Sequence, residues 1–250
     1  MSTSRNILSI SSNFEKDFLK KFGFYLDSLD EIFVIMDNIG LDETNLSELP
    51  KSEGDIYKSI LFLMEAANTT SIGALRLLSG NIFSDANGLL RILYEIACIM
   101  HWGNASEKNK AKIYNEFFKS EVSTKERSKL EWQLIKSAQK LFEDEKSGML
   151  DIRKELDNYG SHISLKKIVM GNVTNMGRAS SSTIFTSNFN NILFLRSLDF
   201  LHSLMLLILE EYSFHNKAYG GLSPDAESKI QKLPENFLLN VRPKLISLQI

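Results

Sequence analysis

Apolar side chains recur every three to four residues along most of this 250-residue chain. That period is typical of amphipathic α-helices, and we find no convincing alternating runs flanked by turn residues, which would indicate strands. The chain also contains no proline over the 173 residues between Pro50 and Pro224. Because proline breaks helix interiors, its absence favours helices as well. The pattern predicts an all-α protein, an antiparallel bundle of long helices.

Glycine, serine and capping residues mark where these helices should begin and end. A polar connector is expected over residues 40–53, and the stretch from Gly171 to Asn188, rich in Ser, Thr, Asn and Gly, should form a long polar loop. Residues 216–250 should form a tail with one or two short helices. Without internal repeats, a single domain with its core in about 14–215 is the simplest organisation. The expected helices cover 14–39, 55–78, 84–102, 107–121, 124–146 and 189–214, with a shorter one over 150–159.

Composition and charge indicate an ordinary soluble protein, because the net charge is only −2 and 24% of the residues are charged. A single cysteine, Cys98, excludes an intramolecular disulfide and fits a reducing cytoplasm. The N-terminus has no apolar signal core, so secretion is not indicated. The most membrane-like stretch, residues 189–209, is interrupted by Arg196, Asp199 and His202, so we expect a buried helix there and no membrane partner.

Motif searches exclude several enzyme classes. The chain has no GxGxxG, GxxxxGK[ST] or GxSxG motif and no set of kinase motifs, so a classical nucleotide-binding enzyme is not expected. It also has no HExxH motif, and one cysteine cannot form a CxxC pair. We therefore expect neither a metal site nor a cofactor.

Three of the expected helices carry a narrow polar seam within an otherwise apolar surface. We expect Arg91 and Glu95 to be buried and paired with another seam, because unpaired buried charges are costly. The partner should be Glu65, Asp199 or Tyr159. The seams form either a structural ion-pair network or a polar cavity that binds an anion or holds a general acid or base. The seam residues are Glu65, Asn68, Thr69 and Arg76 in the 55–78 helix; Ser84, Asn87, Arg91 and Glu95 in the 84–102 helix; and Arg196, Asp199 and Ser203 in the 189–214 helix.

A second group of polar residues surrounds His162 at the end of the 150–159 helix. From Asn158 through Leu198 the chain has no Asp or Glu, while Lys166 and Lys167 remain, so the local field should favour phosphate. Imidazole titrates near neutral pH, so His162 is a candidate acid or base for phosphodiester chemistry. The structural alternative is a capping or hydrogen-bonding histidine.

The run Asn87–Glu95 contains an R-x-x-x-E pattern, and Tyr159–His162 follows about 60 residues later. Together these segments resemble a group of uncharacterised bacterial helical proteins that is similar to the HEPN superfamily. The resemblance implies a helical bundle, often dimeric, and in many members a metal-independent endoribonuclease of a toxin–antitoxin or phage-defence system, with an R-x4–6-H motif. This sequence departs from that motif, since Arg153 stands nine positions before His162. The matching positions are Arg91, Glu95, Tyr159, Ser161 and His162.

Two functional hypotheses follow. The first is a HEPN-like protein that binds or cleaves RNA, with His162 as acid and base, Arg91 and Lys166 contacting phosphate, and Glu95 orienting Arg91. A homodimer belongs to this hypothesis. The second is a non-catalytic helical module that acts through protein contacts or holds a small anionic ligand, while its Arg/Glu network is structural. Residues expected to contact a ligand are Tyr159, Ser161, Lys166, Arg196, Asp199 and Glu65.

Overall fold

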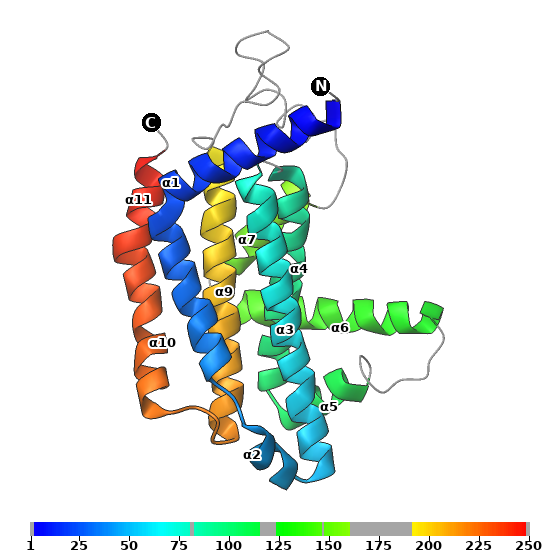
Figure 1. Cartoon of the computed structure of the whole chain (residues 1–250). Helices are drawn as coiled ribbons and strands as arrows, with labels where there is room; N and C mark the ends of the chain where they lie inside the picture. The colour runs from blue at the N-terminus through cyan, green and yellow to red at the C-terminus, as the bar shows by residue number, and fades with distance from the viewer. Residues whose placement is uncertain (1–2, 81–82, 116–123, 147, 161–191, 249–250) are drawn as a thin grey trace.

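The computed structural model describes residues 3–80, 83–115, 124–146, 148–160 and 192–248. Every regular element in these ranges is a helix, which confirms the predicted all-α bundle (Figure 1). In chain order the helices are α1 (Thr3–Asn38), α2 (Glu43–Glu48), α3 (Lys51–Ser79), α4 (Phe83–Asn104), α5 (Glu107–Ile113), α6 (Thr124–Glu145), α7 (Met149–Gly160), α9 (Ile192–Ala218), α10 (Pro224–Asn236), the π-helical segment η3 (Phe237–Val241) and α11 (Arg242–Ser247).

Helices α4 and α9 form the centre of the bundle. α4 packs against α3, α5, α6, α7 and α9, and α9 also contacts α1, α3, α10 and α11. Apolar residues at helical spacing line the buried side of α4, and the thiol of Cys98 is buried in the same helix. Burying this face supplies the main driving force for assembling the bundle. Fully buried members of the α4 stripe are Ala86, Leu90, Leu93, Ala97 and Met100.

Two outer helices have shapes that the sequence pattern did not indicate. α1 begins at Thr3 instead of near residue 14, and it bends at the buried Phe22, whose φ and ψ of −114° and 19° lie outside the helical range. α6 lies across the bundle, and its N-terminal part projects away from the other helices (Figure 1). The bundle is therefore not a set of parallel rods.

Other helix bounds differ locally from the expected ones. The connector expected over 40–53 contains the short helix α2, whose N-cap Asp42 accepts a hydrogen bond from the Asn45 backbone N–H at 2.8 Å. Of the helix expected over 107–121, α5 covers Glu107–Ile113, and residues 116–121 lie outside the described residues. The polar loop expected from Gly171 to Asn188 lies outside the described residues.

The C-terminal segment, defined as α10, η3 and α11, lies along α9 and α1 (Figure 1). Ser223 caps α10 by accepting a hydrogen bond from Ala226 N–H, and Pro224 occupies the first turn, where a missing N–H is harmless. Pro234 lies inside α10, and the wider π-helical turn η3 begins three residues later. The expected tail thus contributes buried side chains to the core, namely Leu233, Phe237, Val241 and Leu245.

A backbone contact joins the turn after α1 to the turn between α9 and α10. Gly40 has a φ of +137°, which side-chain-bearing residues rarely adopt, and its N–H donates to the carbonyl of Gly221 at 3.0 Å. A Cβ on Gly221 would lie 2.9 Å from the Gly40 carbonyl carbon. Tyr57 of α3 reinforces the junction, since its hydroxyl donates to Asn216 at 2.6 Å and accepts from the Leu41 N–H at 2.8 Å. This junction fixes where the C-terminal segment begins.

Candidate functional site

Arg91, the centre of the predicted site, forms two ion pairs on the side of α4 that faces α7. Its Nε lies 2.9 Å from Glu95 Oε1, one turn along α4, and its Nη1 lies 2.7 Å from Asp157 Oδ1 on α7. The three side chains are 18%, 29% and 45% exposed. Arg91 is therefore paired as expected, but the cluster is half-buried at the surface of the bundle instead of lying in its core.

Two further arginines near α7 are paired in the same way. Arg153 Nε of α7 lies 2.9 Å from Glu143 of α6, and Arg196 of α9 lies 3.1 Å from Glu155 of α7. The Tyr94 hydroxyl of α4 also donates to Glu143, at 2.8 Å. These contacts and those of Arg91, together called the arginine network, attach α6 and α7 to α4 and α9.

The predicted partners of Arg91 are corrected by this geometry. Glu65 is exposed on α3, because the buried side of that helix is formed by residues such as Ile60, Ala67 and Ala74. Asp199 pairs instead with Arg242 of α11 at 2.9 Å. The partner that does cross to Arg91 is Asp157, which sequence reasoning did not single out. Between α4 and α9, Asn87 of one seam accepts a hydrogen bond at its Oδ1 from Ser197 Oγ at 3.0 Å, and Ser197 was not a member of the predicted α9 seam.

Replacing Arg91 with leucine is expected to lower the free energy of unfolding by about 1–3 kcal/mol, between the values typical of surface and of buried ion pairs. Water still reaches Glu95 and Asp157, so their carboxylates keep part of their hydration after the change. Urea denaturation measures the effect. Arg196→Leu is the matched control, because Arg196 is 48% exposed and pairs across helices too, and it should cost less than about 1 kcal/mol. Equal losses of unfolding free energy in both variants would contradict the expectation that Arg91 contributes more to stability than Arg196.

The remaining predicted site residues are not placed by the structure. His162, Ser161 and Lys166 lie outside the described residues, and Tyr159 is described only through the backbone of α7. The structure therefore brings Arg91 and Glu95 together but does not test their relation to His162. Ribonuclease chemistry stays a prediction.

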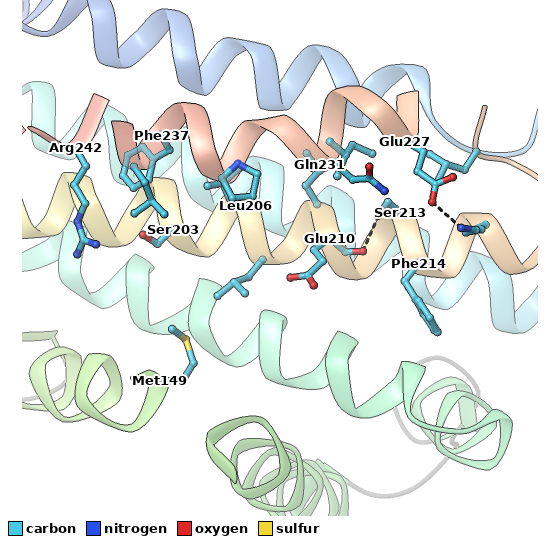
Figure 2. Close-up of a pocket in the computed structure, with 17 residues that line it drawn as sticks. Met149, Ser203, Leu206, Glu210, Ser213, Phe214, Glu227, Gln231, Phe237 and Arg242 are labelled. Carbon is cyan, nitrogen blue, oxygen red and sulfur yellow. Dashed lines mark hydrogen bonds and ion pairs between the residues drawn. The ribbon is translucent and has the colours of Figure 1, made fainter. Parts of the chain in front are cut away.

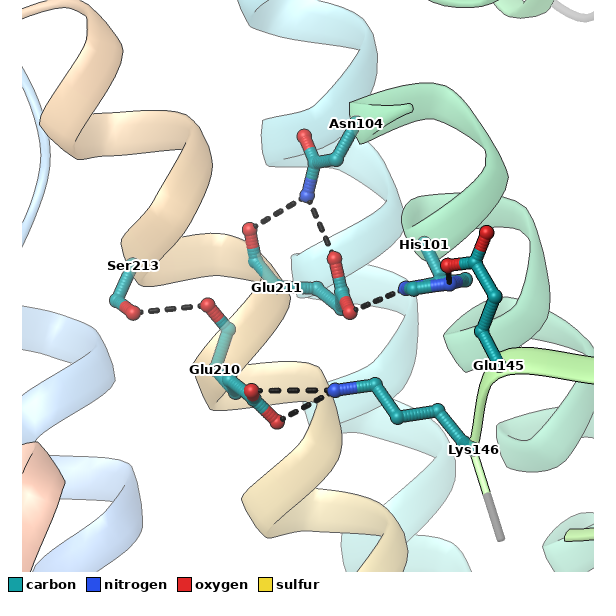
Figure 3. A network of polar contacts seen from close by, with 7 residues as sticks. All are labelled: His101, Asn104, Glu145, Lys146, Glu210, Glu211 and Ser213. Atoms are coloured by element: carbon teal, nitrogen blue, oxygen red, sulfur yellow. Dashed lines mark hydrogen bonds and ion pairs between the residues drawn. The ribbon is translucent and has the colours of Figure 1, made fainter. Parts of the chain in front are cut away.

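His101 at the end of α4 joins three helices through its two ring nitrogens (Figure 3). Nδ1 lies 2.7 Å from Glu211 Oε1 of α9, and Nε2 lies 2.9 Å from Glu145 Oε2 of α6. Asn104 holds the other carboxylate oxygen of Glu211 by donating to it at 2.9 Å. Lys146 pairs with Glu210 beside this group at 3.1 Å. These six residues border a hollow of about 300 Å³.

The electrostatics of this group favour a charged imidazole. The hydrogen bond to Glu211 raises the pKa of His101 above its usual value, and Glu145 adds to the rise, although burial of the ring acts in the opposite direction. Glu211 is only 5% exposed, so the imidazolium and Asn104 supply the partners that a buried carboxylate requires. Both ring nitrogens are engaged, and the arrangement is therefore better suited to holding α6 against α4 and α9 than to proton transfer.

His101→Gln is expected to destabilise the protein at pH 6 and to matter less as the pH rises. Because the folded-state pKa is raised, the stabilising contribution is fully present below the unfolded-state pKa of about 6.5 and is lost as the pH rises through the higher folded-state pKa. Urea unfolding of wild type and variant at several pH values between about 6 and 9 measures the difference. A difference that stays constant over this range would show that His101 acts through packing alone.

An apolar groove, which we call the α9–α10 groove, runs between α9 and the C-terminal segment (Figure 2). Its volume is about 530 Å³, larger than the neighbouring described hollows of about 340 and 300 Å³. Phe214 and Leu238 on its walls are 57% and 52% exposed. Other apolar lining residues are Leu206 and Leu207 of α9, Ile230 and Phe237 of the C-terminal segment, and Met149 of α7.

Comparison with known proteins gives no identification. No family model matches the chain, and no curated protein or solved structure matches it. The HEPN-like relationship is thus neither supported nor contradicted. Within the described residues, no helix has both the length and the apolar character needed to cross a bilayer, and no group of three or more His, Cys, Asp or Glu side chains is placed to hold a metal ion.

Sequence reasoning missed both the His101 group and the α9–α10 groove. His101 has its partners 44 and 110 residues away along the chain, so no local motif reveals it. The groove does have a sequence signal. Ser223-Pro224-Asp225 is a strong helix start, and the apolar positions Ile230, Phe237 and Leu238 that follow lie at helix-like spacing.

Proposed function

We propose that this chain is a non-catalytic helical binding module and that the α9–α10 groove is its binding site. The observation that carries the proposal is the groove itself, a hollow of about 530 Å³ with exposed apolar walls. Pockets for small ligands in proteins typically have volumes of about 300–1,000 Å³ and are lined mainly by apolar side chains. Exposed apolar surface of this kind is costly in water unless a partner covers it.

The arginine network favours a non-catalytic binding module and not an enzyme that binds phosphate. Arg91 and Arg196, the predicted phosphate and ligand contacts, each lie within an ion pair. An incoming phosphate would have to displace Asp157, Glu95 or Glu155 before it could bind. The network also spans α4, α6, α7 and α9, as expected of a structural element that fixes how helices pack.

A solvent-sensitive uncharged dye such as Nile red tests the groove as a binding site. The folded wild type should bind one dye per chain with raised fluorescence, and Leu238→Asp should abolish that signal because it places a carboxylate in the groove wall. The matched control is Leu239→Asp. Leu239 is 65% exposed in the same η3 turn but does not line the groove, so its variant should bind normally. Equal binding by both variants would place the site elsewhere.

The ribonuclease hypothesis has its own test. Wild type and His162→Ala are incubated with single-stranded RNA and transfer RNA in the presence of EDTA. We expect no cleavage by either protein. Cleavage by the wild type that is lost in His162→Ala would overturn the non-catalytic proposal, because an acid or base acts mainly in the transition state.

A further inference from the structure

We propose that the ligand of the α9–α10 groove is the aliphatic chain of a monomeric single-chain lipid, such as a free fatty acid. This inference rests on the proposed function and specifies its ligand. Three properties of the groove carry it, namely its shape, the pairing of its charges and the construction of its wall.

The groove is long. Its lining residues follow α9 from Ser203 to Lys217, which at 1.5 Å per residue is a length of about 21 Å. The opposite wall runs from Leu222 to Arg242 in the antiparallel direction. A trough of this form accommodates an extended chain better than a compact ring system.

Each of the four charged lining residues already has an ionic partner. Lys217 lies 2.6 Å from Glu227 near one end of the groove, and Arg242 lies 2.9 Å from Asp199 near the other. Glu210 pairs with Lys146 at 3.1 Å. A strongly charged ligand would have to break these pairs, whereas an aliphatic chain covers the apolar walls and leaves them intact. The head group of the lipid should therefore remain in solvent and contribute little to recognition.

The wall formed by η3 presents apolar side chains on both sides. Phe237 turns into the core, where it is 3% exposed, while the next residue, Leu238, is 52% exposed on the groove side. π-helical turns such as η3 occur frequently at functional sites. Met149 borders the groove from α7, and its flexible thioether can adapt to chains of different shape.

A chain-length series tests this inference. A dansyl-labelled long-chain fatty acid, used below its critical micelle concentration, serves as the probe, and unlabelled fatty acids of increasing length compete with it. Affinity should rise about two- to fourfold per added methylene, the range for half to full burial of each group, until the groove is filled. Fatty alcohols of the same length should compete about as well as the acids. Leu206→Trp should shift the preference toward shorter chains by obstructing the trough, and Leu239→Trp should not.

The possible results separate this inference from the proposed function. If the apolar dye binds in the groove but affinity for fatty acids does not depend on chain length, the aliphatic ligand is wrong and the binding module stands. The same conclusion follows if acids bind far more tightly than alcohols. If light scattering shows a dimer that Leu238→Asp dissociates, a second copy of the chain occupies the groove and the lipid ligand is overturned. If neither dye nor lipid binds, both proposals fail.

Discussion

Replacing Phe237 with alanine is expected to lower the free energy of unfolding by about 3–5 kcal/mol, the usual cost of truncating a buried phenylalanine. The Phe237 ring is 3% exposed and stacks on His202, with ring centroids 3.9 Å apart and planes inclined by 9°. His202 in turn lies 2.9 Å from the Ser28 hydroxyl of α1. The truncation would leave a cavity where η3, α9 and α1 meet, and it would remove the contact that shields a buried imidazole.

Leu238→Ala is the matched control. The neighbouring Leu238 side chain is 52% exposed, so its truncation should change the free energy of unfolding by less than about 0.5 kcal/mol. Urea denaturation of both variants, with equal m-values, would report the difference as a shift of the midpoint. An unchanged midpoint for Phe237→Ala would mean that the C-terminal segment does not contribute to the stability of the bundle, contrary to the packing described above.

Acidification from pH 7 to pH 5 is expected to cost the folded protein about 4 kcal/mol through two buried histidines. Burial lowers the pKa of His202 to about 4, and burial together with the nearby Lys110 ammonium lowers the pKa of His215 to about 3. Both rings are therefore neutral in the native state at pH 5, whereas the unfolded chain, with histidine pKa values of about 6.5, takes up two protons. Stability must fall as the pH drops below about 6.5.

The His215→Phe variant separates the two contributions. His215 is fully buried, stacks on Tyr57 at 5.2 Å, and neither of its ring nitrogens has a hydrogen-bond partner among the described contacts. Phenylalanine keeps the stacking and cannot be protonated, so the same pH change should cost this variant only about 2 kcal/mol, from His202 alone. His101 offsets part of this loss in both proteins, because its contribution becomes complete only below the unfolded-state pKa of about 6.5, and it therefore cancels when wild type and variant are compared. Identical pH dependence of wild type and variant would rule out His215 as a source of acid sensitivity.

Much of the fold could be predicted from residue periodicity, and the misses have local causes. Long amphipathic patterns located α3, α4, α6 and α9 to within a few residues. The short helix α2 was overlooked because six residues cannot show a period, although Asp42 supplies a clear cap. For residues 216–250 a tail with one or two short helices was expected, whereas α10, η3 and α11 follow one another in the same direction past Pro234.

The candidate sites were harder to predict, because a helical projection gives angles within one helix and not the rotation of that helix in the bundle. Glu65 and Arg91 both lie on polar seams, yet Glu65 is exposed to solvent and Arg91 is turned toward α7. The pairing of Arg91 with Asp157 depends on how a later helix docks. The α9–α10 groove depends in the same way on the antiparallel docking of two helices, which local sequence does not specify.

The buried thiol of Cys98 makes it possible to measure how often the core of the bundle opens. The side chain is fully buried in α4, and burial raises the pKa of the thiol, so both access and thiolate formation are suppressed in the native state. A thiol reagent can react only when the central helices separate. Under excess reagent, the rate of modification of Cys98 therefore reports how often the bundle opens at its centre. The measurement needs no substitution, because this sulfur atom is the only thiol in the chain.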